Sequence, residues 1–284
     1  MGEETILNGR ETDVLLSVVV PTKNRAALVK RVIRVFASFP AEVEVFVVDD
    51  GSDPDCAEIV ASFCNEQPNA KYIRCLGATG AASARNLGHR VSRADYVWFF
   101  DDDDYVDSNT VAQLLRRIRN EPSPREIILL PMSVRHDGLE LYRVDPSATE
   151  HSFERYRSHG SVVNPSCTVF PRQVLDAIGG WDEQIGGGDD TDLFLRCSKL
   201  CQYHCLDSEA VHVNVGHSGR FSDAVWLQER SRFRFLVKHW ADLSLRRKLH
   251  YAVGILLWTP LLNRLFFVSI RAPIMRRLLR QKQR

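Results

Sequence analysis

The sequence predicts an α/β protein built on a mostly parallel central sheet flanked by helices. Two observations carry this prediction. Short apolar, β-branched runs alternate with helix-like segments along the N-terminal part of the chain, and two of these runs end directly in aspartates. Alternating strands and helices are typical of parallel sheets with right-handed crossovers. With 284 residues, of which 44% are hydrophobic and 26% charged, the chain can bury a large core.

The strands and helices are expected in regular order. Apolar β-branched runs predict the strands, and apolar residues at helical spacing predict the helices. The expected strands cover residues 15–20 (ended by Pro21), 43–48, 72–75, 95–100, 126–132 and 166–170, with a hairpin over 135–144 that turns at Asp137-Gly138. The expected helices cover residues 26–39, a segment capped by Ser52 or Asp53 that runs to 63, a segment carrying Arg85 and Asn86, residues 106–119, and a segment that begins near Asp189.

The most informative stretch is the aromatic strand 95–100, which runs straight into four consecutive aspartates, Asp101 to Asp104. Each buried charge needs a partner or a metal, so these carboxylates are expected where the strand leaves the sheet. Ligands of open α/β sheets bind at that edge, and clustered carboxylate oxygens suit Mg²⁺ or Mn²⁺. The alternative is a solvated acidic loop.

A second strand also ends in acid, at Asp49-Asp50-Gly51-Ser52. If the two strands lie side by side, Asp49 and Asp50 converge with the four aspartates on one rim. The alternative for this segment is a turn followed by a helix cap. Neither a Gly-x-Gly-x-x-Gly fingerprint nor a Gly-x-x-x-x-Gly-Lys-Ser/Thr loop occurs, so a bound diphosphate would be held by a metal and by side chains.

A third acidic segment follows three glycines, at Asp189, Asp190 and Asp192. Capping and the helix dipole explain one acid at a helix N-terminus but do not require all three. Upstream of it, Trp181 stands beside paired glycines and is either a core residue or a stacking face for a sugar.

The charge is unevenly distributed between an acidic body and a basic tail. Of the 37 lysines and arginines, ten lie in residues 243–284, which contain no acidic residue, so 27 basic residues face all 36 acidic ones in residues 1–242. An acidic body argues against nucleic-acid binding. Residues 1–13 lack the basic and apolar regions of a signal peptide, and the seven cysteines are expected as reduced thiols in the cytosol. Cys197, Cys201 and Cys205 recur every four residues and could line one side of a helix, without the close cysteine pair of a zinc knuckle.

Taken together, the motifs resemble those of the family-2 glycosyltransferases of the GT-A fold. They occur in that family's order: 19–25, 48–52, 84–88, the Asp-x-Asp at 101–103, the Gly-Gly-Trp turn at 179–183, and 189–193. The resemblance covers about residues 15–220.

The resemblance implies roles for individual residues. Asp101 and Asp103 would bind Mg²⁺ or Mn²⁺, with Asp103 as the direct ligand and His217 near the metal. His212 is the competitor of His217, and a plain core or loop histidine is the alternative to both. Asp190 would be the general base, with Asp189 beside it in place of the family's usual glutamate. The donor nucleotide would be bound by Pro21, Thr22, Asn24, Asp49, Asp50, Arg85, Asp101 and Asp102. The acceptor or the sugar would contact Trp181 and Asp182.

The resulting expectation is an inverting transfer of a sugar, expected to be UDP-linked, to a hydroxyl of a glycan or lipid-linked acceptor in cell-surface polysaccharide synthesis. A nucleotidyltransferase and a catalytically inactive metal-binding relative remain alternatives. Residues 1–235 would form the catalytic domain. Residues 236–284 would form a basic amphipathic helical tail that attaches a cytoplasmic protein to the inner membrane surface. The alternative is that residues 249–270 pack on the catalytic domain or form a homodimer.

Overall fold

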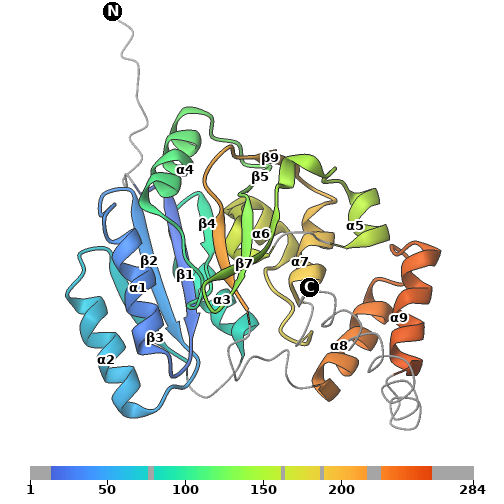
Figure 1. Ribbon diagram of the computed structural model, residues 1–284, viewed down its shortest axis with the longest axis horizontal. Coiled ribbons are helices and arrows are strands. Elements are labelled where there is room, and N and C mark those ends of the chain that lie inside the picture. Colours follow the sequence, from blue (N-terminus) through green and yellow to red (C-terminus); the bar gives the residue numbers. More distant parts are fainter. Residues whose placement is uncertain (1–13, 76–79, 161–163, 186–188, 216–224, 258–284) are drawn as a thin grey trace, which may run out of the picture.

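The computed structural model describes residues 14–75, 80–160, 164–185, 189–215 and 225–257, which form two sheets surrounded by helices (Figure 1). The larger sheet contains β1 (Leu16–Thr22), β2 (Val43–Asp49), β3 (Ala70–Arg74), β4 (Tyr96–Phe99), β5 (Glu126–Leu129), β8 (Thr168–Pro171) and β9 (Gln202–Cys205). The smaller sheet contains β6 (Met132–His136), β7 (Leu139–Val144) and β10 (Val211–Asn214). The α-helices are α1 (Ala26–Phe36), α2 (Pro54–Asn65), α3 (Ala81–Val91), α4 (Ser108–Asn120), α5 (Phe153–His159), α6 (Arg172–Ile178), α7 (Asp189–Cys197), α8 (Val225–Lys238) and α9 (Leu245–Leu257).

The strand order of the larger sheet is β3-β2-β1-β4-β8-β5-β9, and β8 runs antiparallel to both of its neighbours. The prediction of a mostly parallel sheet is therefore confirmed. The chain moves outward from β1 to β2 and β3, and then crosses back through α3 to place β4 on the other side of β1. This reversal of direction creates a switch point at the carboxyl ends of β1 and β4, where open α/β sheets bind their ligands.

The core packs against both faces of the parallel strands. Trp98 and Phe100 point toward α1, where their rings meet Phe36 at 5.5 and 5.4 Å between centroids. On the other face α3 lies so close to β1 that a Cβ atom on Gly88 would stand 2.3 Å from a methyl group of Val19. A glycine is therefore needed here for the helix to approach the strand.

Some predicted boundaries are wrong in detail. β1 continues through Pro21, which pairs with Val48, and ends one residue later. The expected strand 126–132 is divided between β5 and β6. Neither proposed cap of α2 forms a capping hydrogen bond, although Asp53 occupies the N-cap position. The hairpin prediction is confirmed, since Asp137 and Gly138 both have positive φ, as the favoured two-residue hairpin turn requires.

The seven cysteines are all free, but they do not form a helical stripe. Cys197 ends α7, Cys201 follows it, and Cys205 lies on β9. The predicted common helix for these three residues is therefore wrong, because the helix stops and a strand of the main sheet begins.

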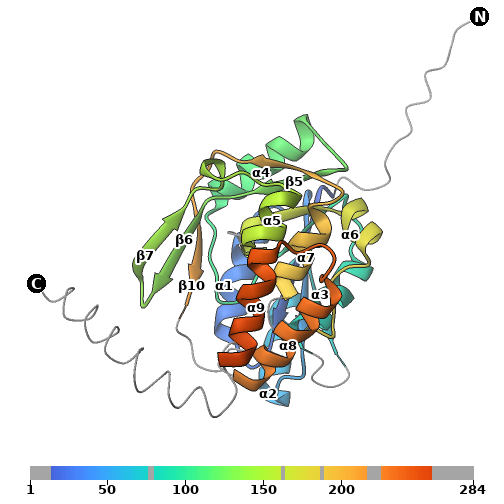
Figure 2. The same ribbon diagram turned by 90° about the vertical axis from the view of Figure 1, so that its right-hand side faces the viewer.

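The C-terminal part of the described chain packs on the body. Figure 2 shows α8 and α9 side by side next to α7. The expected domain boundary at residue 235 falls inside α8, where Phe235 and Leu236 are both buried. Within the described residues no helix combines the length and the apolar character needed to cross a membrane. Residues 258–284, which include much of the expected membrane segment, lie outside the described chain.

Candidate active site

Four segments meet at the carboxyl edge of the parallel strands. Three of them follow β1, β2 and β4, and the fourth is the N-terminus of α7. Because β1 lies between β2 and β4, its loop forms hydrogen bonds with both of the others. The predicted acids therefore surround one edge, although β2 and β4 are separated by β1 and do not pair directly.

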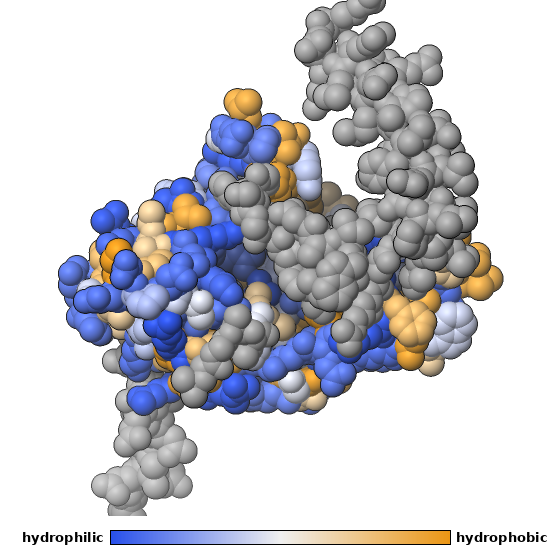
Figure 3. Space-filling view, turned by 90° about the horizontal axis from the view of Figure 1, so that it is seen from below, coloured by the Kyte–Doolittle hydropathy of each residue, from blue (hydrophilic) through white to orange (hydrophobic). Residues whose placement is uncertain are grey.

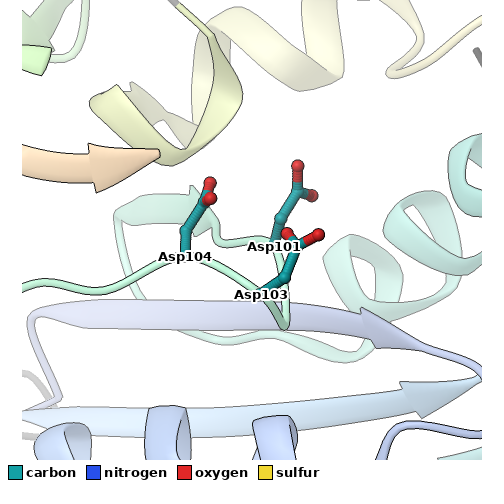
Figure 4. A group of neighbouring side chains, drawn as sticks. All are labelled: Asp101, Asp103 and Asp104. Atoms are coloured by element: carbon teal, nitrogen blue, oxygen red, sulfur yellow. The ribbon is translucent and has the colours of Figure 1, made fainter. Parts of the chain in front are cut away.

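Three carboxylates of the loop after β4 come together. One oxygen atom from each of Asp101, Asp103 and Asp104 lies within 4.8 Å of the other two, and Figure 4 shows the three side chains rising from the same turn. The turn breaks the alternation of a strand, so the adjacent Asp103 and Asp104 present their carboxylates to the same side. Three hard oxygen ligands in this arrangement suit Mg²⁺ or Mn²⁺.

Asp104 carries a specific sign of a cation site. Its side chain is buried, and its Oδ1 accepts a hydrogen bond from the Asn214 backbone amide at 3.0 Å. Among the described residues its Oδ2 has no hydrogen-bond partner at normal geometry, although the Ser166 hydroxyl lies close enough to the carboxylate to lower its pKa. Burial, followed by the charges of Asp101 and Asp103, raises the pKa of Asp104 well above its ordinary value. An open carboxylate oxygen in such a place is what a divalent cation would neutralise.

Asp102 is directed to the loop after β1. Its carboxylate accepts hydrogen bonds from Thr22 Oγ1 at 2.7 Å and from an Arg25 guanidinium nitrogen at 3.0 Å. Burial raises the pKa of Asp102 to about 6, although these two donors oppose the rise. Arg25 also lies 3.2 Å from Asp103 Oδ2, so one cation links the two strand ends.

The loops after β1 and β2 are joined through Asn24, which has a φ of 56°. The Asn24 backbone N–H donates to Ser52 Oγ at 2.8 Å, and the Asn24 side-chain oxygen Oδ1 accepts from the Asp53 backbone N–H at 2.7 Å. Asparagine tolerates this left-handed conformation better than most residues. These reciprocal bonds leave the two loops in one fixed arrangement at the edge of the sheet.

The two aspartates at the end of β2 differ in what they contact. Asp49 is buried and accepts from the Ser52 amide at 2.7 Å and from the Tyr72 hydroxyl at 2.5 Å. Its carboxylate thus closes the turn, as in the alternative prediction for this segment. Asp50 is half-buried and accepts from the Gly80 amide at 3.0 Å, which connects the end of β2 to the start of α3.

Arg85 connects the Asp101–Asp104 cluster to the N-terminus of α7. One terminal nitrogen of its buried guanidinium lies 2.7 Å from Asp101 Oδ1, and the other lies 3.5 Å from Asp189 Oδ2. The guanidinium carbon lies 4.5 Å from the ring centroid of Trp181. A cation fixed by two carboxylates and an aromatic face is held in a single position.

The carboxylates of Asp189 and Asp190 are poorly solvated at the start of α7. Burial raises the pKa of Asp189 to about 6, an effect that the positive charge of Arg85 opposes and that the neighbouring Asp190 reinforces. The pKa of Asp190 is also raised by burial, although its Oδ1 accepts from the Thr191 amide at 2.6 Å. A helix N-terminus favours an anion, so burial outweighs the helix dipole here.

The family of the chain follows from comparison with known proteins. The model of the family described as glycosyl transferase family 2 matches residues 17–178, which is more than half of the chain and includes the loops after β1, β2 and β4. The chain belongs to glycosyl transferase family 2. Glycosyltransferase GlyG of Streptococcus pneumoniae serotype 4 is 31% identical over 38% of this chain, and the match spans 36% of GlyG, about a third of that relative.

Solved structures of glycosyltransferases have the same GT-A fold. Staphylococcus aureus TarS 1–349 in complex with UDP-GlcNAc superposes with a TM-score of 0.66 at 19% identity, over 86% of this chain and 72% of TarS 1–349. The mannosyltransferase PcManGT of Pyrobaculum calidifontis, in complex with GDP-Man and Mn²⁺, gives a TM-score of 0.60 at 17% identity, over 92% of this chain and 75% of PcManGT. At these identities the likeness establishes the fold alone.

Of the residues assigned to the acceptor or the sugar in this family member, Trp181 is a core residue. It is 3% exposed, packs edge-on against Phe99 and supports Arg85. The side chain is therefore packed as a core residue, and its contact with a sugar stays a prediction. Asp182 is half-buried and accepts from Lys238 of α8 at 2.5 Å.

Of the two histidines considered for the metal site, the structure describes only His212. His217 lies outside the described residues. His212, its competitor, lies on β10 with its ring 5.5 Å from that of Tyr105, and burial lowers its pKa.

Three residues of the site were not assigned a role from the sequence, namely Arg25, Asp104 and Asn214. The Asn214 side-chain Nδ2 donates to the backbone carbonyl of Asp103 at 2.5 Å, and the Asn214 backbone N–H donates to Asp104 Oδ1. Two of the three had a signal, since Arg25 ends the first motif and Asp104 completes the run of four acids. Asn214 had no such signal, because it lies on β10, far along the sequence from Asp103 and Asp104.

Proposed function

We propose that this protein is an inverting, metal-dependent glycosyltransferase that moves a sugar from a nucleotide-diphosphate donor, a UDP-sugar, to a hydroxyl of the acceptor. The observation that carries the proposal is the double contact of Arg85 with Asp101 and Asp189. This contact supports an arrangement in which the aspartate cluster and the acidic N-terminus of α7 line one site, as transfer between two substrates requires. The family membership and the fold support the same reading.

Asp101, Asp103 and Asp104 would hold Mg²⁺ or Mn²⁺, with Asp103 as a direct ligand. The bound ion would supply positive charge to the diphosphate as it leaves the sugar. Support comes from the open oxygen of Asp104 and from the Mn²⁺ in the complex of PcManGT. His217 is proposed as a further group near the metal.

Asp190 is proposed as the general base, with Asp189 as its neighbour. A base accepts the proton of the acceptor hydroxyl while the hydroxyl oxygen attacks the anomeric carbon, and attack on the face opposite the diphosphate inverts that centre. Burial favours this role, because a carboxylate with a raised pKa accepts a proton more readily near neutral pH. Arg85 opposes the rise for Asp189 and so helps to keep the pair ionised.

The donor nucleotide is proposed to bind along the loops after β1 and β2. Asp50, Thr22 and Asn24 lie at that edge, whereas Pro21 and Asp49 shape it from within the sheet and the turn. Arg85, Asp101 and Asp102 complete the predicted set. The UDP-GlcNAc and GDP-Man present in the two similar structures support a nucleotide-sugar donor.

The acceptor is proposed to be a glycan or a lipid-linked molecule in cell-surface polysaccharide synthesis. In this proposal the enzyme works at the cytoplasmic face of the inner membrane, which its basic C-terminal residues contact. Residues 1–235 supply the catalytic domain and residues 236–284 the tail. A homodimer through the tail is the alternative arrangement.

The proposal is tested by incubating the purified protein with a panel of UDP-, GDP- and TDP-sugars and Mn²⁺, without an acceptor. Slow release of a nucleoside diphosphate is expected from one donor, and chelation by EDTA should stop it. A nucleotidyltransferase would instead produce pyrophosphate from a nucleoside triphosphate and a sugar phosphate. A protein that binds Mn²⁺ but hydrolyses no donor, even when candidate acceptors are added, would contradict the enzymatic proposal.

A further inference from the structure

An apolar stripe runs along the outer side of α8 and the turn that follows it. Phe233, Val237 and Trp240 are spaced four and three residues apart, which places them on one side of the helix, and each is more than half exposed. The opposite side buries Phe235, Leu236 and His239 against the body. The exposed aromatic side chains are therefore not needed to hold α8 in place.

A second stripe lies on α9. Leu245, Leu249 and Val253 recur every four residues and are between 47% and 72% exposed. The inner side of this helix contributes Arg247, whose guanidinium carbon lies 5.6 Å from the ring centroids of both Phe235 and Tyr251. The two helices are thus packed together with both apolar stripes turned outward. Figure 3 shows apolar side chains at the end of the molecule that these helices form.

The rim of this double stripe is basic. The Lys248 ammonium lies 4.8 Å from the ring centroid of Trp240, and Arg246 lies on the other side of α9. Asp242 is the only acidic residue between Ser231 and Leu257, and its carboxylate is bound by Lys199 at 2.8 Å. Over residues 231–253, whose side chains the structure describes, the patch therefore offers apolar area and cations without an available anion.

The combination of exposed apolar side chains and cations distinguishes between two possible partners of the patch, a second copy of the chain and a lipid surface. In a symmetric contact with a second copy, the same patch faces itself, so its cations would meet cations without a compensating carboxylate. An anionic lipid surface accepts the apolar side chains among its acyl chains and the cations among its headgroups. Tryptophan is favoured at that boundary.

We propose that the outward stripes of α8 and α9, formed by Phe233, Val237, Trp240, Leu245, Leu249 and Val253, dock on an anionic lipid bilayer. The patch joins Phe233 to the part of the proposed tail, residues 236–257, that packs on the body, and it excludes residues 258–284. It rests on the proposed membrane contact and names the surface that would make it. The helix that carries part of this surface also contacts segments next to the candidate active site, because Lys238 of α8 contacts Asp182 and Asp192, and Arg234 contacts the carbonyl of Gln184. Docking there would bring a lipid-linked acceptor to the edge of the sheet.

The test uses the full-length protein and sucrose-loaded vesicles of phosphatidylcholine, alone or mixed with phosphatidylglycerol. Cosedimentation is expected with the anionic vesicles and not with the neutral ones. The triple variant Phe233→Ser, Val237→Ser, Trp240→Ser should weaken binding at least about tenfold, since three inserted apolar side chains are lost. The matched control is Leu139→Ser, Leu141→Ser on β7, where two exposed leucines should be replaced without effect.

Three results would overturn the proposal. Unchanged binding by the triple variant would assign docking to residues 258–284, and equal loss in the β7 control would indicate a nonspecific effect. A wild-type dimer that the triple variant converts to a monomer, measured by light scattering without lipid, would identify the patch as a contact between copies. The thermal midpoint of each variant checks its folding. Because vesicle binding needs neither donor nor acceptor, its outcome is independent of the proposed enzymatic activity.

Discussion

The guanidinium of Arg85 lies between two carboxylates that are far apart in the sequence, 2.7 Å from Asp101 and 3.5 Å from Asp189. One belongs to the cluster that could hold a divalent cation, and the other begins the helix that carries the proposed base. The Trp181 ring below the guanidinium prevents it from moving away. Arg85 therefore sets both the spacing and the electrostatic balance of the two halves of the site.

Replacing Arg85 should change the pH dependence of turnover. Burial raises the pKa of Asp189 to about 6, and the charge of Arg85 opposes this rise. Burial also raises the pKa of the proposed base Asp190, so wild-type turnover should fall on the acid side of neutral pH as the base becomes protonated. Arg85→Gln removes the opposing charge, so the pKa should rise and the midpoint should move to higher pH.

The measurement is the pH profile of kcat, whose midpoint is independent of the absolute rate. Arg90→Gln is the matched control, because Arg90 is exposed on the same helix. An acid midpoint that Arg85→Gln leaves in place would show that Arg85 does not act on the base. Arg85→Lys should partly restore the wild-type midpoint.

Asp190→Asn should separate chemistry from binding. Without a base, kcat should fall by about 10²–10⁴-fold, whereas donor affinity should stay near the wild-type value. Single-turnover kinetics and donor titration measure the two quantities separately. If Asp189→Asn has the larger effect on kcat, then the proton goes to Asp189 instead. Asp176→Asn, an exposed change on α6, serves as the control.

The three clustered aspartates should bind a divalent cation together. Calorimetry with Mn²⁺ should detect one site in the wild-type protein, and both Asp103→Ala and Asp104→Ala should lose it. Donor affinity should then become the same in Mn²⁺ and in EDTA. Asp55→Asn, an exposed acid on α2, should bind Mn²⁺ normally. Wild-type Mn²⁺ affinity in Asp104→Ala would exclude that residue from the metal site.

Asp192 should stabilise the fold through α8. It is fully buried, and its carboxylate contacts Arg196, Lys238 and His239 at 2.5, 2.8 and 2.6 Å. Burial alone would raise its pKa, but these partners outweigh burial and lower it. Asp192→Asn should therefore reduce the free energy of unfolding by about 3–5 kcal/mol near neutral pH, as expected when one partner of a buried ion pair is removed.

The pH dependence of that loss has a defined sign. A carboxylate with a lowered pKa in the folded state stabilises it fully above its unfolded pKa, which is about 4. The stability difference between wild type and Asp192→Asn should thus be constant above about pH 5 and shrink as the pH falls below about 4. Denaturant unfolding at several pH values measures it. Glu154→Gln, which breaks an exposed pair with Arg157, should cost less than about 1 kcal/mol at any pH.

The sequence by itself determined the order of the strands and helices from β1 to β5, and which strands end in acidic residues. This was predictable because the signals are local: β-branched runs such as 43–48 form strands, and the charges of Asp101 to Asp104 cannot enter the core. The hairpin at Asp137-Gly138 was predictable for the same reason, since the turn depends on only two residues.

Only the tertiary structure decided which of these acids share a site and which side chains are buried or bonded within the fold. The crossover of the chain before β4 put Asp102 against Thr22, and packing enclosed Trp181 beneath Arg85. Asn214 reached Asp103 and Asp104 from a strand more than a hundred residues away. Such contacts depend on how whole elements pack in three dimensions, and no local pattern of residues records that.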